Sequence, residues 1–472
     1  MNFIEKVNDY IWSNYLIILC ISSGIYYSVK YNFLQITLIK DMLKLLFQKS
    51  NSTQGISSFQ AFTLAISGRI GTGNIAGVAT AIAMGGPGAL FWMWIIAFLG
   101  SASAIIEASL AQLYKEKSSV YFIGGPAFYI KKGLNSKIGA ITFSVVTIIS
   151  TGFLLPSVQS NSISLANTEA FQFPKELVGI ILVVLVASIV IGGVKRIGRL
   201  TELIVPFMAL GYIMMALIII MLNINKLPDI FVLIVSSGTS LHSFYGGIVG
   251  SAIAWGIKRG IYSNESGQGT APHAAAAAAV THPIKQGLVQ GFSVYIDTLF
   301  VCTATGLMIL FTNQFNVMDT EGGFLINNLK DVQMGPAYTQ YAIAKHFPSI
   351  GKEFVAISLT FFAFTTILAY YYIAETNVKF LFRKRRWAVY LVQFLLFTSV
   401  YLGAITTAKN AWTLGDIGVG LMAWINLISI FLLRNVFSIL YKDYRNQKNT
   451  GKDPVFDNSK YKIENVDCWN SK

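Results

Sequence analysis

Long apolar stretches separated by short polar connections recur along the chain. Each has about the 20 residues that an α-helix needs to cross the hydrocarbon core of a bilayer. We expect spans at 10–31, 61–84, 88–114, 138–156, 177–194, 200–223, 243–280 with an interruption, 286–312, 353–381, 388–407 and 411–435. The stretches 229–241 and 313–347 are too short or too polar to cross and are expected at the surface. The pattern predicts an all-α polytopic membrane protein with about 11 transmembrane helices.

The spans after the first divide into two sets of five. An odd number of crossings per half gives the halves opposite orientations, which is the inverted-repeat topology of secondary transporters. The first span of each half carries a similar pattern, with Arg69, Asn74 and Gly77 matched by Arg259, Asn264 and Gly267. We therefore expect an extra N-terminal helix and loop in 1–50, a first repeat in 51–225, a second repeat in 226–440 and a polar tail in 441–472.

Composition supports the membrane assignment and excludes other classes. The chain is 54% hydrophobic and 12% charged, whereas soluble domains carry about 25% charged residues. The net charge of +14 does not indicate a nucleic-acid partner, because the basic residues lie mainly in short connections between spans. Cys20, Cys302, Cys468 and the four histidines show neither a disulfide framework nor metal-ligand spacing.

Basic residues concentrate in the connections after alternate spans, which predicts orientation. They are Lys40, Lys44, Lys49, Lys115, Lys117, Lys131, Lys132, Lys195, Arg196, Arg199, Arg383, Lys384, Arg385 and Arg386. All of them are cytoplasmic if the N-terminus lies outside, and the C-terminus is then also cytoplasmic. We expect a multi-pass protein of the plasma (inner) membrane, with a tail that is partly disordered.

The first core span has four glycines near its middle, Gly68, Gly71, Gly73 and Gly77. A glycine inside a helix costs roughly 1 kcal/mol relative to alanine, so the run predicts a break in the helix. Carbonyls before a break suit a hard cation, and the amides of the following half-helix suit a carboxylate. Close packing through small residues is the alternative. It is equally well supported for Gly77, but it fits residues 71–74 poorly because a buried Asn74 is costly there.

A second polar interruption occupies 255–273, inside the span at 243–280. It contains Lys258, Arg259, Ser263, Asn264, Glu265, Gly267 and Gln268. Pro272 suits the first turn of a following half-helix. A cytoplasmic loop is the alternative, but the apolar run 271–280 is too short to span alone, which favours a second broken helix.

Polar residues in other spans complete the set of candidates. Thr360, Thr365 and Thr366 lie in one apolar run, although a threonine in a membrane helix usually bonds its own i−4 carbonyl. Gln159, Asn161 and Ser162 follow Pro156 and belong either to a loop or to a pocket. We expect Glu107, Asp297 and Glu375 to face the bundle interior and to pair with Arg69, Arg259 or another cation.

Three segments resemble the signatures of the alanine/glycine:cation symporter family, also called sodium:alanine symporters. They are 71–94, which begins Gly-Thr-Gly-Asn-Ile-Ala-Gly, 259–272, which reads Arg-Gly-Ile-Tyr-Ser-Asn-Glu-Ser-Gly-Gln-Gly-Thr-Ala-Pro, and 362–370. The resemblance implies a leucine-transporter-like fold, a 5+5 inverted repeat with an extra N-terminal helix. It also implies sodium-driven uptake of alanine, glycine or, in some members, glutamine.

The resemblance and the residue patterns together give a set of site residues. For the substrate we expect Thr72, Gly73, Asn74, Gly77, Gln159, Asn161, Ser263, Asn264, Gly267, Gln268 and Tyr370. For sodium we expect Ser67, Ile70, Asn74, Thr365 and Thr366. The predicted partners are the bilayer, sodium and a small neutral amino acid. No cofactor is expected besides the coupling ion, and the oligomeric state stays open.

Two positions depart from the family pattern. The family usually has Gly-Trp where this chain has Ala369-Tyr370, and commonly Met or Leu where it has Gln268. A phenol and an amide in these places suggest a more polar substrate, such as glutamine, asparagine or serine. The alternatives to sodium symport are a proton-coupled porter using Glu265, Asp297 or Glu107, and a non-transporting amino-acid sensor. An enzyme would have only Ser263 with His273 as a loose nucleophile–base pair, so no enzymatic activity is expected.

Overall fold

The computed structural model describes residues 3–48, 55–117, 122–192, 194–239, 249–319, 323–383 and 385–469, without the side chains of 194, 195 and 249. Several sequence predictions lie outside this part. They are Lys49, Lys384, the side chain of Lys195, the boundary at 50–51 and the start of the interrupted span at 243–248.

Seven helices in the described part of the chain are long and apolar enough to cross a membrane: Gly88–Leu113, Lys137–Phe171, Arg196–Leu222, Pro283–Thr312, Gly351–Phe382, Arg386–Ile405 and Ala408–Leu432. The other four predicted spans are shorter or broken: α2 (Asn14–Lys30), α11 (Lys175–Val190), α5 (Ser58–Arg69) with α6 (Val78–Gly85), and α14 (Val249–Asn264) with α15 (Ala271–Ala277). The prediction of an all-α polytopic membrane protein is confirmed.

Each half of the bundle begins with a broken helix and continues with long helices. In the first half these are α7 (Gly88–Leu113), α9 (Lys137–Ile149), η2 (Ser150–Leu154), α10 (Leu155–Phe171), α11 and α12 (Val194–Leu222). In the second they are α16 (Pro283–Tyr295), η5 (Ile296–Cys302), α17 (Thr303–Thr312), α19 (Gly351–Phe382), α20 (Arg386–Ile405) and α21 (Ala408–Leu432). Both α14 and α16 pack against α7, so the two halves interlock rather than form separate domains.

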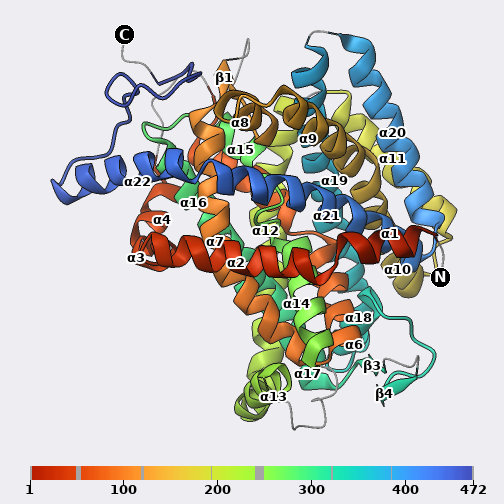
Figure 1. Ribbon diagram of the computed structural model, residues 1–472. Coiled ribbons are helices and arrows are strands. Elements are labelled where there is room, and N and C mark those ends of the chain that lie inside the picture. Colours follow the sequence, from red (N-terminus) through yellow and green to blue (C-terminus); the bar gives the residue numbers. More distant parts are fainter. Residues whose placement is uncertain are drawn as a thin grey trace.

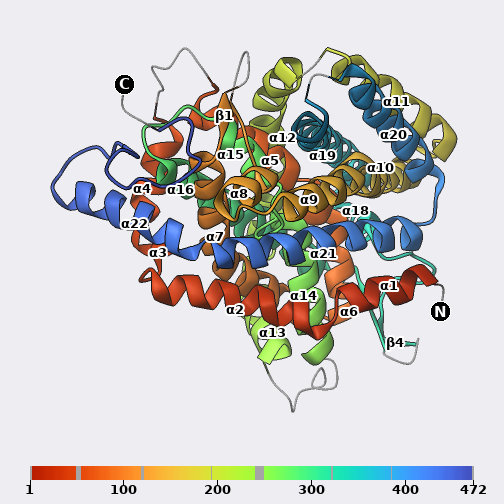
Figure 2. The ribbon, with the colours of Figure 1, turned by 45° about the horizontal axis from the view of Figure 1, so that its top comes forward.

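The N-terminal helices lie outside this bundle. Figure 1 shows α1 (Phe3–Ile11) and α2 crossing the front of the molecule, and α2 packs against α7 and α21. They lead to α3 (Leu34–Thr37) and α4 (Ile39–Leu46). In Figure 2, α2 and α21 run side by side across the front. This is the extra N-terminal helix that the sequence predicts.

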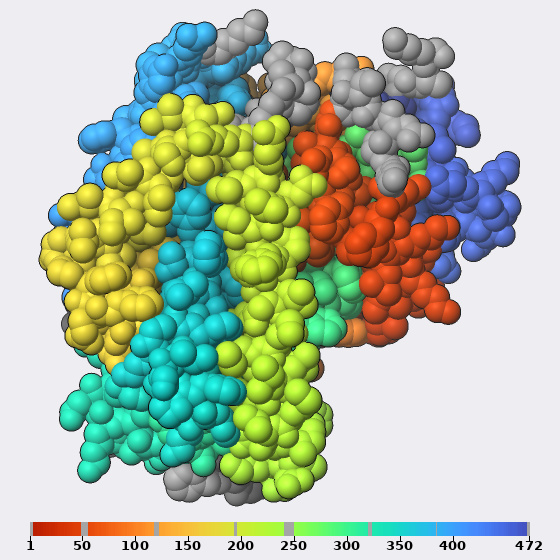
Figure 3. All heavy atoms as spheres, turned by 180° about the vertical axis from the view of Figure 1, so that it is seen from behind, coloured from red at the N-terminus to blue at the C-terminus, as the bar shows by residue number. Residues whose placement is uncertain are grey.

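One side of the bundle is formed largely by apolar side chains that point outward. Figure 3 shows α11 and α12 on this side, with α19 between them. Phe207 is 82% exposed and Leu203 is 74% exposed on α12. Exposed apolar side chains on a spanning helix are expected to face lipid, because lipid tails are as apolar as they are.

The connections contain short elements. They are β1 (Glu116–Lys117) paired antiparallel with β2 (Phe122–Ile123), α8 (Pro126–Gly133), η3 (Ile224–Lys226), α13 (Leu227–Thr239), β3 (Asn316–Met318) paired antiparallel with β4 (Phe324–Asn327), and α18 (Pro336–Ala344). Within the described residues, the stretches 229–241 and 313–347 thus contain no helix long enough to cross, as predicted.

The polar tail is folded against the bundle, which corrects the expectation of partial disorder over its described part. After α22 (Arg434–Asn449) it packs Phe456 and Trp469 inward, and the Trp469 Nε1 donates to the Gln112 carbonyl at 2.9 Å. Ion pairs join Lys285 to Asp453 and Lys132 to Asp467, each at 2.7 Å. Phe456 and Trp469 are separated by many polar residues, so the average composition of the tail did not indicate that it would pack against the bundle. The tail therefore lies on the same face as the connection after the third predicted span.

Replacing Trp469 with alanine is expected to release the tail. Removing a buried tryptophan costs about 3 kcal/mol, so detached tails should become far more frequent. The rate of limited proteolysis within the tail reports this opening. Lys460→Ala is the matched control, because Lys460 is exposed in the same segment. Equal cleavage rates in the two variants would contradict the packing described.

Candidate functional site

The first core span is broken where its glycines predicted a break. Helix α5 ends at Arg69, and Ile70 has extended backbone with φ −74° and ψ 91°. The chain resumes as the π-helical turn η1 (Gly73–Gly77) and continues into α6. The Asn74 Oδ1 accepts from the Gly71 amide at 2.8 Å. The side chain of Asn74 thus closes the turn that separates the two half-helices.

The second broken helix is interrupted between α14 and α15. Glu265, Gly267 and Gly269 all have positive φ values, which end α14 and turn the chain. Glu107 on α7 accepts from the Gly267 amide at 3.3 Å and from the Asn426 Nδ2 at 2.7 Å. Asn426 also donates to the Gly267 carbonyl at 2.9 Å. Side chains of two neighbouring helices, Glu107 of α7 and Asn426 of α21, therefore hold the backbone of this break in place.

The two breaks lie against each other. A Cβ added at Gly73 would lie 2.9 Å from the Cα of Ser263, so only a glycine allows this approach. At Gly77 an added Cβ would meet nothing closer than Trp412 at 3.6 Å, an ordinary contact. Gly73 thus has a strict steric role, and Gly77 packs against α21.

Gly73→Ala is expected to reduce the transport that the sequence predicts by on the order of tenfold or more, because overpacking against backbone costs roughly 1–3 kcal/mol. The initial rate of substrate uptake into proteoliposomes measures the effect. Gly77→Ala is the control and should keep most of the activity. A fully active Gly73→Ala protein would show that the close approach of the breaks is dispensable.

A buried carboxylate connects the two breaks. Asp297 lies in the π-helical turn η5 and accepts from Asn74 Nδ2 at 2.6 Å. It also accepts from Ser263 Oγ at 2.9 Å and from Thr298 Oγ1 at 2.7 Å. Asn264 donates to Thr298 Oγ1 at 3.3 Å, which extends the cluster. Every partner is a neutral group, so a small cation could be accommodated on the carboxylate with oxygen ligands around it.

A second cluster of oxygens lies between α5 and α19. The Thr366 Oγ1 is 2.9 Å from the Ser67 carbonyl oxygen, 3.3 Å from that of Ile70 and 2.9 Å from that of Phe362. The Thr365 Oγ1 lies 3.0 Å from the same Phe362 oxygen. Backbone carbonyls and hydroxyls without a nitrogen or sulfur ligand suit a hard monovalent or divalent cation. The predicted sodium ligands Ser67, Ile70 and Thr366 are thus brought together, with Thr365 one carbonyl away.

Buried polar atoms without hydrogen-bond partners remain close to the breaks. Among the described residues they include Thr72 Oγ1 and both polar atoms of the Gln268 amide. Buried polar groups are nearly always paired, so unpaired ones call for a ligand or water. Gln159 accepts from the Thr72 amide at 3.0 Å, which brings α10 to the same place. Tyr370 is buried beside Glu265.

Ion pairs differ from those that the sequence predicted. Arg69 donates to the Gln290 carbonyl at 3.1 Å and to Ser293, and it forms no salt bridge with a described residue. Glu107 and Asp297 likewise accept only from neutral groups in the described part. The prediction that these two carboxylates pair directly with a cation is therefore wrong. Glu375 does pair, with Lys379 at 2.5 Å.

Arg259 has a different environment from its counterpart Arg69. It pairs with Asp416 of α21 at 2.5 Å, and Lys258 reaches the same carboxylate at 2.8 Å. The Arg259 guanidinium also lies 4.4 Å from the centre of the Trp412 ring. The breaks are thus covered by a buried ion-pair and aromatic cluster joining α14 to α21.

Two predicted residues lie outside these clusters. Asn161 donates to the Gly403 and Thr406 carbonyls at 3.1 and 2.8 Å, so it fixes the end of α20 rather than joining the breaks. His273 bonds Thr270 and Asn377, and Ser263 bonds Asp297, so the two do not form a nucleophile–base pair.

Other contributors were missed by sequence reasoning. The Phe362 carbonyl has no side-chain signature, but it lies three and four residues before the threonine pair, where their hydroxyls reach back. Thr298 adjoins Asp297, and Asp416 is a lone carboxylate in an apolar span. A carboxylate inside a membrane span is expected to face the bundle interior and to pair with a cation, so Asp416 could have been predicted as a partner of Arg259 from the sequence.

Comparison with known proteins identifies relatives over the whole chain. The model of the sodium:alanine symporter family matches residues 1–458. The protein YrbD of Bacillus subtilis is 51% identical over 99% of this chain and 97% of its own length, and its name describes a sodium/proton-dependent alanine carrier. The B. subtilis protein GlnT, named as a probable sodium/glutamine symporter, is 42% identical over 98% of this chain and 94% of its own. The crystal structure of an Eremococcus coleocola manganese transporter has a similar fold, with a TM-score of 0.52 at 12% identity over 84% of this chain and 82% of that one.

Proposed function

The chain belongs to the sodium:alanine symporter family, and from this premise we propose that it takes up a small neutral amino acid together with sodium. The observation that carries the proposal is the threonine–carbonyl cluster of Ser67, Ile70, Phe362 and Thr366. It bridges the first broken helix to α19. A cation there would fix the unwound geometry of the break and hence the substrate site beside it.

The Asp297 cluster is proposed as a second cation site. Asn74, Ser263 and Asp297 come from three separate helices and meet at the crossing of the breaks. A buried carboxylate without a cationic partner is costly, and a bound cation would offset that cost. This site would thus be stabilised when loaded, which is how a gradient-driven ion can promote substrate binding.

We propose that the substrate binds beside these cations at the two breaks. Its carboxylate would meet amides near residues 73–77, and its ammonium would meet carbonyls near 263–267. The unpaired Thr72 hydroxyl and Gln268 amide are available to complete its hydrogen bonds. The ion pair of Arg259 and Asp416 would cover the site from the outside, with the N-terminus outside and the C-terminus cytoplasmic.

Reciprocal binding is the direct test of coupling at this site. Sodium and substrate must tighten each other by the same factor. Alanine affinity is measured with and without saturating sodium, and sodium affinity with and without saturating alanine. Equal factors well above one support the proposal, and a factor of one in both directions would overturn it.

Side-chain selection is proposed to lie at Gln268 and Tyr370. Both are buried, and the relatives include proteins named for alanine and for glutamine. A competition panel of neutral amino acids against labelled alanine and glutamine, run with Tyr370→Trp alongside, tests this. The substitution is expected to shift preference toward alanine by about tenfold, as loss of one buried polar partner does. An unchanged preference would rule out a role for position 370.

Proton coupling is the second candidate, favoured by the sodium/proton-dependent name of the relative YrbD. Asp297 or Glu265 would then carry the proton, since both are buried carboxylates that accept from neutral groups such as Ser263 and Thr270. Uptake driven by a pH gradient without sodium would support this candidate. Binding without any uptake would instead indicate an amino-acid sensor.

A further inference from the structure

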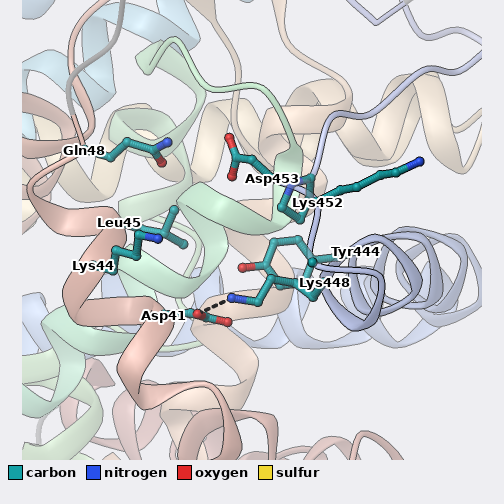
Figure 4. Close-up of a pocket in the computed structure, with 10 residues that line it drawn as sticks. Asp41, Lys44, Leu45, Gln48, Tyr444, Lys448, Lys452 and Asp453 are labelled. Atoms are coloured by element: carbon teal, nitrogen blue, oxygen red, sulfur yellow. Dashed lines mark hydrogen bonds and ion pairs between the residues drawn. The ribbon is translucent and has the colours of Figure 1, made fainter.

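A cavity of about 270 Å³ lies between α4 and the start of the tail, and no residue of the two breaks lines it. Its lining residues are Asp41, Lys44, Leu45, Gln48, Tyr444, Lys448, Gly451, Lys452, Asp453 and Pro454. Figure 4 shows the α4 residues on one side and those of α22 and the tail on the other, with Asp41 and Lys448 in contact below Tyr444. Two segments distant in sequence thus enclose a polar cavity.

The charges around this cavity do not balance. Each acidic group already has a lysine partner, since Asp41 pairs with Lys448 at 2.5 Å and Asp453 pairs with Lys285 at 2.7 Å. Lys44 and Lys452 form no salt bridge within the part of the chain that the structure describes. In Figure 4, Lys452 extends from the rim away from the ion pair. The surplus positive charge fits an anionic ligand.

The surface beside the cavity is apolar. Ile36, Ile39, Leu43 and Phe47 are 50%, 40%, 46% and 73% exposed. Their spacing of three or four residues places them on one side of the α3–α4 segment. This segment directly follows α2, so it is expected at the level where lipid headgroups meet the acyl chains. A small soluble anion would leave these apolar side chains exposed, whereas the acyl chains of a lipid would bury them.

We propose that this cavity binds the headgroup of an anionic phospholipid. The lipid phosphate contacts Lys44 in the cavity, Lys452 at the rim turns toward it on binding, and the acyl chains lie over Leu43 and Phe47. Binding there joins the N-terminal helices to the tail, because α4 and α22 contribute the two walls. The site is separate from the transport site and does not depend on the transported substrate.

Lipid titration of the purified full-length protein in neutral detergent tests the proposal. Phosphatidylglycerol is expected to raise the thermal unfolding midpoint and to remain bound in native mass spectrometry, and phosphatidylcholine is not. A basic residue near an anionic membrane surface contributes about fivefold in affinity. The double variant Lys44→Gln/Lys452→Gln should therefore weaken phosphatidylglycerol binding about 25-fold.

The control is Lys40→Gln, one turn earlier on the same segment and absent from the cavity lining. It should weaken phosphatidylglycerol binding much less than Lys44→Gln does. Equal loss in the two single variants would show diffuse surface attraction and overturn the proposal. Equal retention of phosphatidylglycerol and phosphatidylcholine would also overturn it. So would stabilisation by inorganic phosphate or glycerol 3-phosphate equal to that by the lipid, because the ligand would then be a free anion.

Discussion

Valine in place of Thr366 is expected to raise the sodium concentration needed for half-maximal uptake by about 10- to 100-fold. The Thr366 hydroxyl is the only side-chain oxygen described within hydrogen-bond distance of the Ser67 and Ile70 carbonyls. Valine keeps the shape and removes the oxygen, and hydrogen bonds or ligands to a charged partner contribute about 1.5–3 kcal/mol. The measurement is initial uptake as a function of external sodium.

The chain offers a matched control on the same helix. Thr376 is buried in α19, and its hydroxyl bonds only the Tyr372 carbonyl one turn back. Thr376→Val should leave the sodium dependence unchanged. Thr365→Val should give a smaller shift than Thr366→Val, since its hydroxyl reaches the cluster only through the Phe362 carbonyl. An unaltered sodium dependence in Thr366→Val would remove this cluster as the sodium site.

Asn in place of Asp297 is expected to have the second large effect, a loss of at least about tenfold in cation-dependent uptake. The substitution keeps the size of the side chain and removes its negative charge. It also places an NH₂ group or a neutral oxygen opposite the Asn74 amide, which now donates to the carboxylate at 2.6 Å. Uptake and the thermal unfolding midpoint are measured together, so that loss of function is separated from loss of the fold.

Glu375→Gln is the control for Asp297→Asn. Glu375 is another carboxylate in a spanning helix, but it pairs with Lys379 and lies apart from the breaks. Glu375 is itself buried, at 8% exposed, so its replacement can affect the stability of the protein, but it should leave the cation dependence of uptake unchanged. A protein with Asn at 297 that transports normally with unchanged cation dependence would contradict the proposed role of the Asp297 cluster.

Much of the fold followed from the sequence for a simple reason. Apolar runs near 20 residues specify spanning helices, and glycine clusters specify where such helices break. Both breaks occur where the patterns around Gly71 and Gly267 placed them. The folding of the tail could not be predicted in this way. Trp469 and Phe456 are isolated apolar residues in a polar segment, and whether they become buried depends on the surface of the bundle against which they pack.

The candidate site was only partly predictable. The signatures brought Asn74, Ser263 and Thr366 into consideration because their side chains stand out in apolar spans. They did not predict the Phe362 carbonyl, since a backbone oxygen has no residue type. Nor did they predict that Asn161 turns toward α20, because helix rotation depends on packing between segments far apart in the chain.

Uptake of labelled alanine into proteoliposomes tests the central claim most directly. The same vesicles are given an inward sodium gradient, equal sodium on both sides, or an inward proton gradient without sodium. Sodium-coupled symport predicts accumulation above equilibrium with the sodium gradient and no accumulation in the other two conditions, and Thr366→Val should lose the accumulation at low sodium. Accumulation that is indifferent to the sodium gradient would contradict sodium-coupled symport by this protein.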